Sequence, residues 1–116
     1  MQNTGRKCKV IAVSSQKGGV SKTTTTVNLG IGLVRAGKKV LLLDIDAQGN
    51  LTASMGIRES DRLEKTFATV IAAVMEGREV EPDFGILTHE EGVQFLPANI
   101  DLAAVEVSLI SAMGRE

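Results

Sequence analysis

Short apolar runs alternate with longer stretches of helical periodicity along this chain. Residues 10–13 form a run rich in β-branched residues that ends at two serines, which is typical of a strand buried on both faces. Residues 40–43 form a second, entirely apolar run. Residues 84–88 and 93–96 are two more short runs separated by a turn-like segment. They predict a strand pair, or one strand with an irregular neighbour.

Three stretches between and after these runs have the spacing of helices. In residues 23–36, Val27, Ile31 and Val34 recur at helical intervals, and Gly37 follows where glycine commonly ends a helix. Residues 63–76 show the same periodicity. A last helix is expected after Asn99, its candidate N-cap. The apolar residues that can share one face of that helix are Ile100, Ala103, Ala104, Val107 and Ile110.

The order of these elements predicts an α/β fold with a doubly wound, mostly parallel sheet. A strand at 10–13, a helix at 23–36 and a strand at 40–43 would make a right-handed βαβ unit. In such sheets ligands bind at the carboxyl ends of the strands. We therefore expect ligand-binding or catalytic residues in the segments that follow residues 13 and 43.

The first of these segments is a glycine turn, residues 16–24, with the sequence QKGGVSKTT. A strand, a glycine-rich turn and a helix N-terminus together make a phosphate-binding loop. Lys22 would reach the outer phosphates of a nucleotide, and the Thr23 hydroxyl would hold magnesium. The pattern GxxxxGK[ST] is not met in full, because Gln16 and Ser21 stand at its first two glycine positions. The alternative is a simple glycine-rich turn with two solvated lysines.

The second segment carries two acids, Asp44 and Asp46, directly after the run at 40–43. If both strands are parallel neighbours in one sheet, these acids emerge at the same edge as the glycine turn. The alternative is structural, since an aspartate at a strand end can cap the backbone that follows.

Composition narrows the classes of function. Apolar residues make up 43% of the 116-residue chain and charged residues 23%, with a formal net charge of −1. No broad basic surface for nucleic acid or membrane follows from these values. The single cysteine, Cys8, excludes an internal disulfide and is expected to be a buried or half-buried thiol. His89 is interpreted as a solvated loop residue, and without a leader or membrane segment the protein is expected in the cytoplasm.

The glycine turn resembles the deviant Walker A motif of the ParA/Soj/MinD family of P-loop ATPases, most closely the ParA/Soj branch. The resemblance rests on a first lysine, Lys17, ahead of the glycine pair and on the Lys22–Thr23 pair behind it. It implies ATP and Mg²⁺ as cofactors, an ATP-dependent homodimer, and a catalytic role for Lys17 at the partner's nucleotide. The implied cofactor-binding residues are Lys17, Gly18, Gly19, Val20, Ser21, Lys22, Thr23 and Thr24.

The run DIDAQGN, residues 44–50, resembles the DxDPQGN segment of the same family, with Ala47 in place of the proline. The resemblance implies that Asp44 helps to hold magnesium through water, beside Thr23. It also implies that Asp46 belongs to a switch region needed for hydrolysis, which makes it the second catalytic candidate.

The resemblance extends over residues 9–116, with residues 1–8 expected to be a flexible tail. It implies an ATPase module of a chromosome or plasmid partition protein, with non-specific DNA and a ParB-like partner bound through regions beyond this chain, and no membrane. No apolar run here ends in the aspartate of a Walker B strand. We therefore expect an N-terminal part of a longer domain, marginally stable or self-associating alone. The alternatives are a non-hydrolysing nucleotide-binding or interaction module and a MinD-like positioning ATPase.

Overall fold

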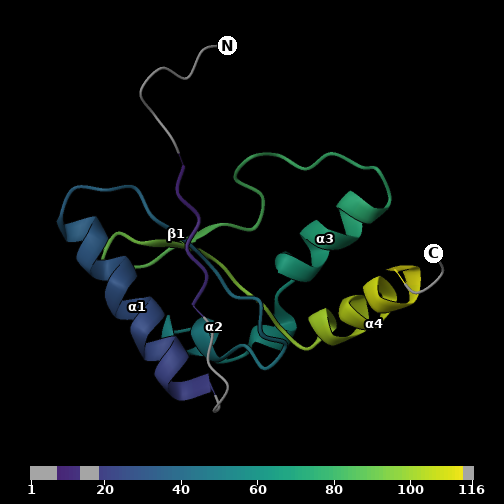
Figure 1. Ribbon diagram of the computed structural model, residues 1–116, viewed down its shortest axis with the longest axis horizontal. Coiled ribbons are helices and arrows are strands. Elements are labelled where there is room, and N and C mark those ends of the chain that lie inside the picture. The colour runs from purple at the N-terminus through teal and green to yellow at the C-terminus, as the bar shows by residue number, and fades with distance from the viewer. Residues whose placement is uncertain (1–7, 14–18, 114–116) are drawn as a thin grey trace, which may run out of the picture.

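The computed structural model describes residues 8–13 and 19–113 (Figure 1). Within these ranges, no helix is both long and apolar enough to cross a membrane. A single 3₁₀ turn, Ser60–Arg62, lies between α2 and α3. The helices and strands are, in chain order, α1 (Gly19–Arg35), β1 (Leu41–Leu43), α2 (Asn50–Ser54), α3 (Phe67–Met75), β2 (Leu87–Thr88), β3 (Gln94–Leu96) and α4 (Asp101–Met113).

The described strands form one three-stranded sheet in the order β1-β3-β2. β1 runs parallel to β3, with Leu42 opposite Phe95, and β2 pairs antiparallel with β3. The predicted strand pair and the predicted α/β class are thus confirmed. The connection from β1 to its parallel neighbour β3 passes through α2, α3 and β2. It brings the segment after β1 close to the segment after β3.

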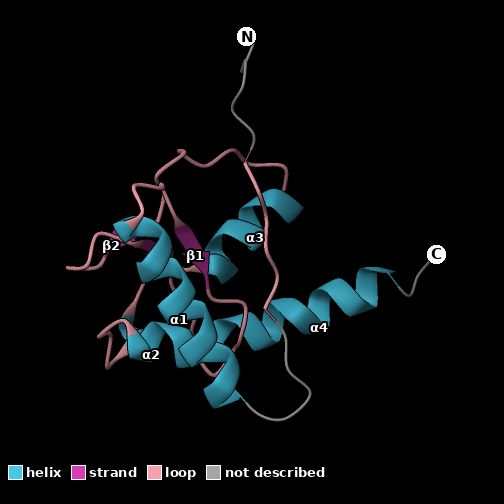
Figure 2. Ribbon diagram, turned by 60° about the vertical axis from the view of Figure 1, so that its left-hand side comes forward, coloured by secondary structure: helices cyan, strands magenta, loops and turns pink. Residues whose placement is uncertain are grey.

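The main core lies between this sheet and α1. Leu42 and Phe95, opposite each other in the sheet, are both buried. Val27, Ile31 and Val34, the residues whose spacing predicted the helix, pack against them. Figures 1 and 2 show α1 on one side of β1, and α3 and α4 on the other.

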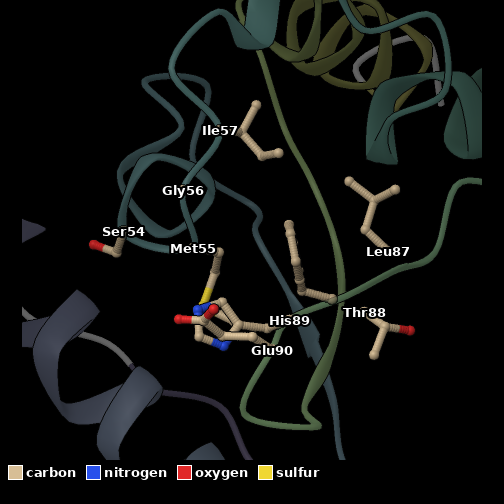
Figure 3. A pocket seen from close by; sticks show the side chains of 9 residues that line it. Ser54, Met55, Gly56, Ile57, Leu87, Thr88, His89 and Glu90 are labelled. Atoms are coloured by element: carbon tan, nitrogen blue, oxygen red, sulfur yellow. The ribbon is translucent and has the colours of Figure 1, made fainter.

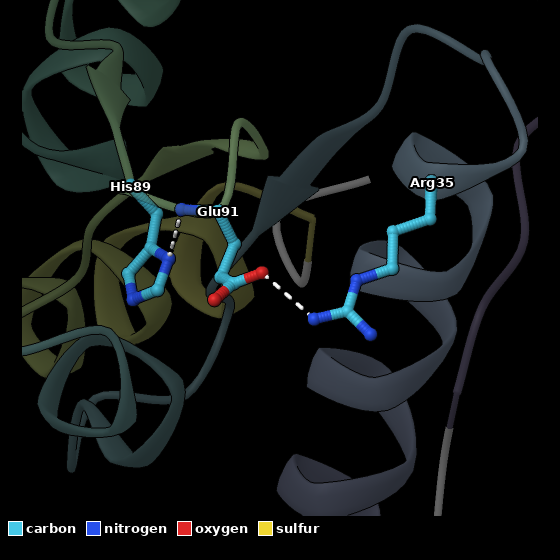
Figure 4. A network of polar contacts seen from close by, with 3 residues as sticks. All are labelled: Arg35, His89 and Glu91. Atoms are coloured by element: carbon cyan, nitrogen blue, oxygen red, sulfur yellow. Dashed lines mark hydrogen bonds and ion pairs between the residues drawn. The ribbon is translucent and has the colours of Figure 1, made fainter.

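The C-terminal end of α1 closes in the way that the sequence predicts. At its C-terminus Gly37 has φ +88°, and the N–H of Lys38 donates to the Leu33 carbonyl at 3.0 Å, which closes the helix as expected. Arg35 then forms an exposed ion pair with Glu91 at 3.0 Å (Figure 4). In the same turn, the Glu91 N–H donates to Nδ1 of His89 at 3.0 Å. These contacts tie the β2–β3 turn to the end of α1.

The predicted strand at residues 10–13 is not a strand in the structure. Val10 and Ile11 are 88% and 62% exposed, and the segment passes the sheet without pairing with it (Figure 1). The expectation of a strand buried on both faces, and of a βαβ unit closed by it, was therefore wrong for the described residues. An apolar run becomes a strand only where a neighbour accepts its backbone hydrogen bonds, and β1 pairs only with β3 here. Cys8, expected to be at least half-buried, is exposed.

α4 packs through a different face from the one that was predicted. Asn99 caps it as expected, because the Asp101 N–H donates to Asn99 Oδ1 at 3.0 Å. However, Val107 and Ile110 are 64% and 70% exposed. Leu102 contacts Ala68 of α3 and Ala98 instead, and forms a second, smaller core with them. In α4 the apolar residues extend around most of the helix, so periodicity alone did not identify the packed face.

Candidate functional site

The N-terminus of α1 offers free backbone donors. Gly19 to Lys22 are its first four residues, and the N–H groups of a helix's first turn have no partner inside the helix. These groups and the helix dipole favour an anion at this end. Lys17 and Gly18 lie outside the described residues, as do the side chains of Val20 and Ser21, so the roles predicted for these residues and for Gly19 stay predictions.

Lys22 and Thr23 line a pocket together with both acids that follow β1. We call this the α1–β1 pocket; its volume is about 220 Å³. α1 provides Lys22, Thr23 and Thr26, and the segment after β1 provides Asp44 and Asp46. The remaining lining residues are Val13, Leu43, Ile45 and Leu51. The two segments singled out in the sequence therefore meet in one place.

Asp44 is the more buried of the two acids, with only 3% of its surface exposed. Its Oδ2 accepts two hydrogen bonds from Thr52 of α2, one from the backbone N–H at 2.9 Å and one from the hydroxyl at 2.6 Å. Its Oδ1 accepts one from the Asp46 N–H at 3.1 Å. A carboxylate has about four acceptor positions, so one position, on Oδ1, is left for a further donor.

Asp46 organises the loop that follows β1. Its Oδ1 accepts a hydrogen bond from the Gln48 N–H at 3.0 Å, and its Oδ2 accepts one from the Asn50 side chain at 3.1 Å. Gly49, at φ +67°, makes the turn that brings Asn50 back toward Asp46. The structural alternative considered for the acids, capping of the backbone that follows, is thus realised by both, since Asp44 accepts from the Asp46 N–H and Asp46 accepts from the Gln48 N–H. Both acids nevertheless line the α1–β1 pocket.

The surroundings of Asp44 fit a hydrated magnesium ion. None of the three ion pairs found among the described residues involves either acid, and a buried carboxylate is costly without a nearby cation. Within those same residues, no group of three or more acidic, histidine or cysteine side chains could enclose a metal. Mg²⁺ commonly binds through one or two carboxylates, waters and substrate phosphates, which is the arrangement that Thr23, Asp44 and a phosphate would provide.

The threonines of α1 do not all face this pocket. Thr23 is 8% exposed and lines it, whereas Thr24, a predicted cofactor contact, is exposed and does not. Thr26 also lines the pocket, and its hydroxyl donates to the Lys22 carbonyl at 2.8 Å. Sequence reasoning missed Thr26 and Thr52; a run of four threonines hinted at the first, and no local signal pointed to the second.

A larger hollow lies elsewhere and is lined by fewer charged side chains. The α2–β2 hollow, about 470 Å³, opens between the end of α2 and strand β2 (Figure 3). Its only titratable lining residues are His89 and Glu90, beside the buried apolar residues Met55 and Phe95. No lysine and no helix N-terminus faces it among the described residues. The α1–β1 pocket is therefore the better candidate site.

Comparisons with known proteins place the chain in a family. Residues 8–116 match a family model described as an AAA domain. The Bacillus subtilis sporulation initiation inhibitor protein Soj is 42% identical over 110 residues, which cover 93% of this chain and 41% of Soj. The chromosome partitioning protein ParA of Caulobacter vibrioides is 40% identical over 101 residues, covering 87% of this chain and 36% of ParA.

Solved structures also share the fold. A crystal structure named as cobyrinic acid a,c-diamide synthase from Mycobacterium smegmatis, with a bound ATP analogue and magnesium, matches with a TM-score of 0.73. It is 42% identical, and the match covers 84% of this chain and 37% of that one. The same protein with bound ADP and magnesium matches with a TM-score of 0.72.

The chain spans only part of the length of its curated relatives, 41% of Soj and 36% of ParA. The match to the family model nevertheless covers nearly all of this chain. Together with the α/β fold and the convergence of Lys22, Thr23 and Asp44 on one pocket, it shows that the chain belongs to the AAA-domain family of P-loop ATPases that includes Soj and ParA.

Proposed function

We propose that this chain forms the phosphate- and magnesium-binding part of the ATP site of a ParA-type partition ATPase. The observation that carries the proposal is the α1–β1 pocket, where a lysine and a threonine at a helix N-terminus oppose two strand-end acids. Ligand pockets are commonly about 300–1,000 Å³. A volume of about 220 Å³ suits the triphosphate end and its metal rather than a whole nucleotide.

Lys22, Thr23 and Asp44 each have a distinct proposed role in this pocket. Lys22 and the free N–H groups of the first turn of α1 bind the phosphates. Thr23 offers its hydroxyl to magnesium, and Asp44 accepts a hydrogen bond from a water on the metal through the free position of Oδ1. When bound, the metal neutralises charge on the phosphate oxygens. Gly18, Gly19, Val20, Ser21 and Thr24 remain proposed cofactor contacts by resemblance.

Hydrolysis is assigned to two further residues. Asp46 lines the same pocket and is assigned the positioning of the attacking water. Hydrogen bonds from Gln48 and Asn50 hold its carboxylate in place for that role. Lys17 neutralises phosphate charge across an ATP-dependent homodimer, a role that rests on the resemblance. The dimer, a cytoplasmic location, DNA, a ParB-like partner and a plasmid or chromosome cargo belong to this proposal for the whole protein.

Partition is preferred to synthase chemistry because two relatives from separate organisms, ParA of Caulobacter vibrioides and Soj of Thermus thermophilus, are both named for chromosome partitioning. The solved structure with bound nucleotide carries the name of a synthase instead. The nucleotide-site assignment is the same in both cases, since both would use the same lysine, threonine and acids.

The test is binding of a fluorescent ATP analogue with Mg²⁺ to purified protein. Lys22→Ala is expected to weaken binding about 10- to 100-fold, because one to two charge-assisted hydrogen bonds to phosphate are lost. Lys38→Ala is the matched control, since Lys38 is an exposed lysine at the opposite end of α1. Absence of binding by the unmodified protein, or equal losses in both variants, would reject the proposal.

Turnover distinguishes the proposed ATPase from a non-hydrolysing module. Phosphate release should accompany binding if Asp46 and Lys17 act as assigned. Tight binding without phosphate release would favour the alternative, a non-hydrolysing nucleotide-binding or interaction module.

A further inference from the structure

The hydroxyl group of Thr52 links Asp44 in the α1–β1 pocket to the segment that leads into α4. Thr52 is completely buried. Its hydroxyl donates to Asp44 Oδ2 at 2.6 Å and accepts a hydrogen bond from the Ala98 N–H at 2.9 Å. A hydroxyl has one hydrogen to donate. Because the Ala98 N–H can only donate, the proton of Thr52 is directed to Asp44.

These bonds fix the orientation of the carboxylate. Thr52 donates twice to Oδ2, through its backbone and its side chain, and two donors fill the positions of that oxygen. The hydroxyl distance is in the range of a charge-assisted O–H···O⁻ bond. Rotation of the carboxylate would break both contacts inside a buried site. Oδ1, with one position still free, is thereby held as the oxygen available to the pocket.

The surroundings of Ala98, the donor to the Thr52 hydroxyl, are also tightly packed. Ala98 is buried, and its carbonyl oxygen lies 3.1 Å from where a Cβ on Gly49 would stand. The next residue, Asn99, caps α4 and donates to the Ser60 carbonyl at 3.1 Å. Thr52 therefore connects the strand-end acid, α2 and the α4 cap through contacts that leave little free space.

We propose that Thr52 is a positioning residue for magnesium: its hydroxyl, held by the Ala98 N–H, orients Asp44 so that Oδ1 meets the hydrated metal beside the nucleotide phosphates. This rests on the proposed function, because it assigns a role toward the same metal. It predicts a change in metal dependence rather than in nucleotide affinity itself. A purely structural threonine in α2 would not change the two separately.

The experiment compares Thr52→Val with Thr52→Ser by titrating Mg²⁺ into purified protein with a fluorescent ATP analogue. Thr52→Val keeps the shape and removes the hydroxyl. It should raise the Mg²⁺ concentration for half-maximal binding about tenfold, the lower end of the effect of removing a residue that orients a metal ligand. Binding without Mg²⁺ should be unchanged. Thr52→Ser keeps the hydroxyl and should match the unmodified protein.

The outcomes separate the two proposals. If the unmodified protein binds no nucleotide, the proposed function fails and this inference fails with it. If the unmodified protein binds but Thr52→Val has the same Mg²⁺ dependence, only the role of Thr52 is rejected. The same holds if Thr52→Val weakens Mg²⁺-free binding as much as Mg²⁺-dependent binding. If a melting curve shows that Thr52→Val is unfolded, Thr52→Cys, with a weaker donor, replaces it under the same criteria.

Discussion

The two hollows of this protein differ in an instructive way. The α2–β2 hollow has about twice the volume of the α1–β1 pocket, about 470 Å³ against about 220 Å³. Yet the smaller pocket combines a lysine, hydroxyl groups, two carboxylates and the free donors of a helix N-terminus. The larger one offers an imidazole and an exposed glutamate beside apolar side chains. Volume by itself therefore does not identify the site.

The difference extends to how the polar groups are held. In the α1–β1 pocket, Asp44 is buried and accepts three hydrogen bonds. In the α2–β2 hollow, the imidazole of His89 accepts one hydrogen bond, from the backbone N–H of Glu91 in its own turn. A group that is buried and fully oriented before any ligand arrives is what binding and catalysis require. Substitutions should consequently have very different effects in the two places.

The largest effect is expected for Lys17→Ala, which tests whether the smaller pocket is completed by a second subunit. ATP turnover should fall about 100- to 1,000-fold, as on removal of one group that stabilises transition-state charge. Affinity for nucleotide should change far less, because a group that acts across the dimer contributes mainly after association. Lys9→Ala, at an exposed lysine of the same region, is the control. Equal losses of binding and turnover would contradict the cross-dimer role.

An intermediate effect is expected for Asp44→Ala on folding. The substitution leaves the buried N–H and hydroxyl of Thr52 without their acceptor, and each unsatisfied buried group costs about 1–3 kcal/mol. We expect the free energy of unfolding in urea to fall by about 2–4 kcal/mol. Glu90→Ala, in the larger hollow and exposed, should cost about 0.5 kcal/mol or less. Similar small losses in both variants would contradict the expected difference in stability effects between the two hollows.

The smallest effect is expected for Arg35→Ala, beside the larger hollow. Its ion pair with Glu91 joins side chains that are 72% and 40% exposed, and such pairs contribute about 0.2–1 kcal/mol. A double-mutant cycle with Glu91→Ala, followed by urea unfolding, measures that coupling. Nucleotide affinity should stay unchanged. A coupling well above 1 kcal/mol would contradict the small contribution expected of an exposed pair, and a loss of nucleotide binding would show that the β2–β3 turn communicates with the pocket.

Local sequence features predicted those parts of the structure that depend on neighbours close in the chain. The end of α1 at Gly37, the cap of α4 by Asn99 and the pairing of β2 with β3 all follow from short-range chemistry. The convergence of Lys22 and Asp44 was predicted from the general behaviour of parallel sheets. It occurs here although the run at residues 10–13 does not join the sheet.

The features that were missed depend on distant parts of the chain. Residues 10–13 have the composition of a strand, but pairing needs a neighbouring strand that composition does not supply. The buried face of α4 is decided by contact between Leu102 and α3, and its apolar residues are too numerous to show which face that is. Thr52 accepts a hydrogen bond from Ala98, which is 46 residues away in the chain, so no local sequence pattern indicates its role.

The hydrogen bonds to Asp44 also have a kinetic consequence. All three donors to the carboxylate are groups of the protein itself, so its orientation is settled during folding rather than during binding. Loading of Mg²⁺ should then proceed in a single fast phase, without a slow rearrangement of the loop after β1. Among divalent ions, Mg²⁺ should be preferred to Ca²⁺, because a carboxylate that reaches the metal through a water suits the ion that keeps its waters most firmly.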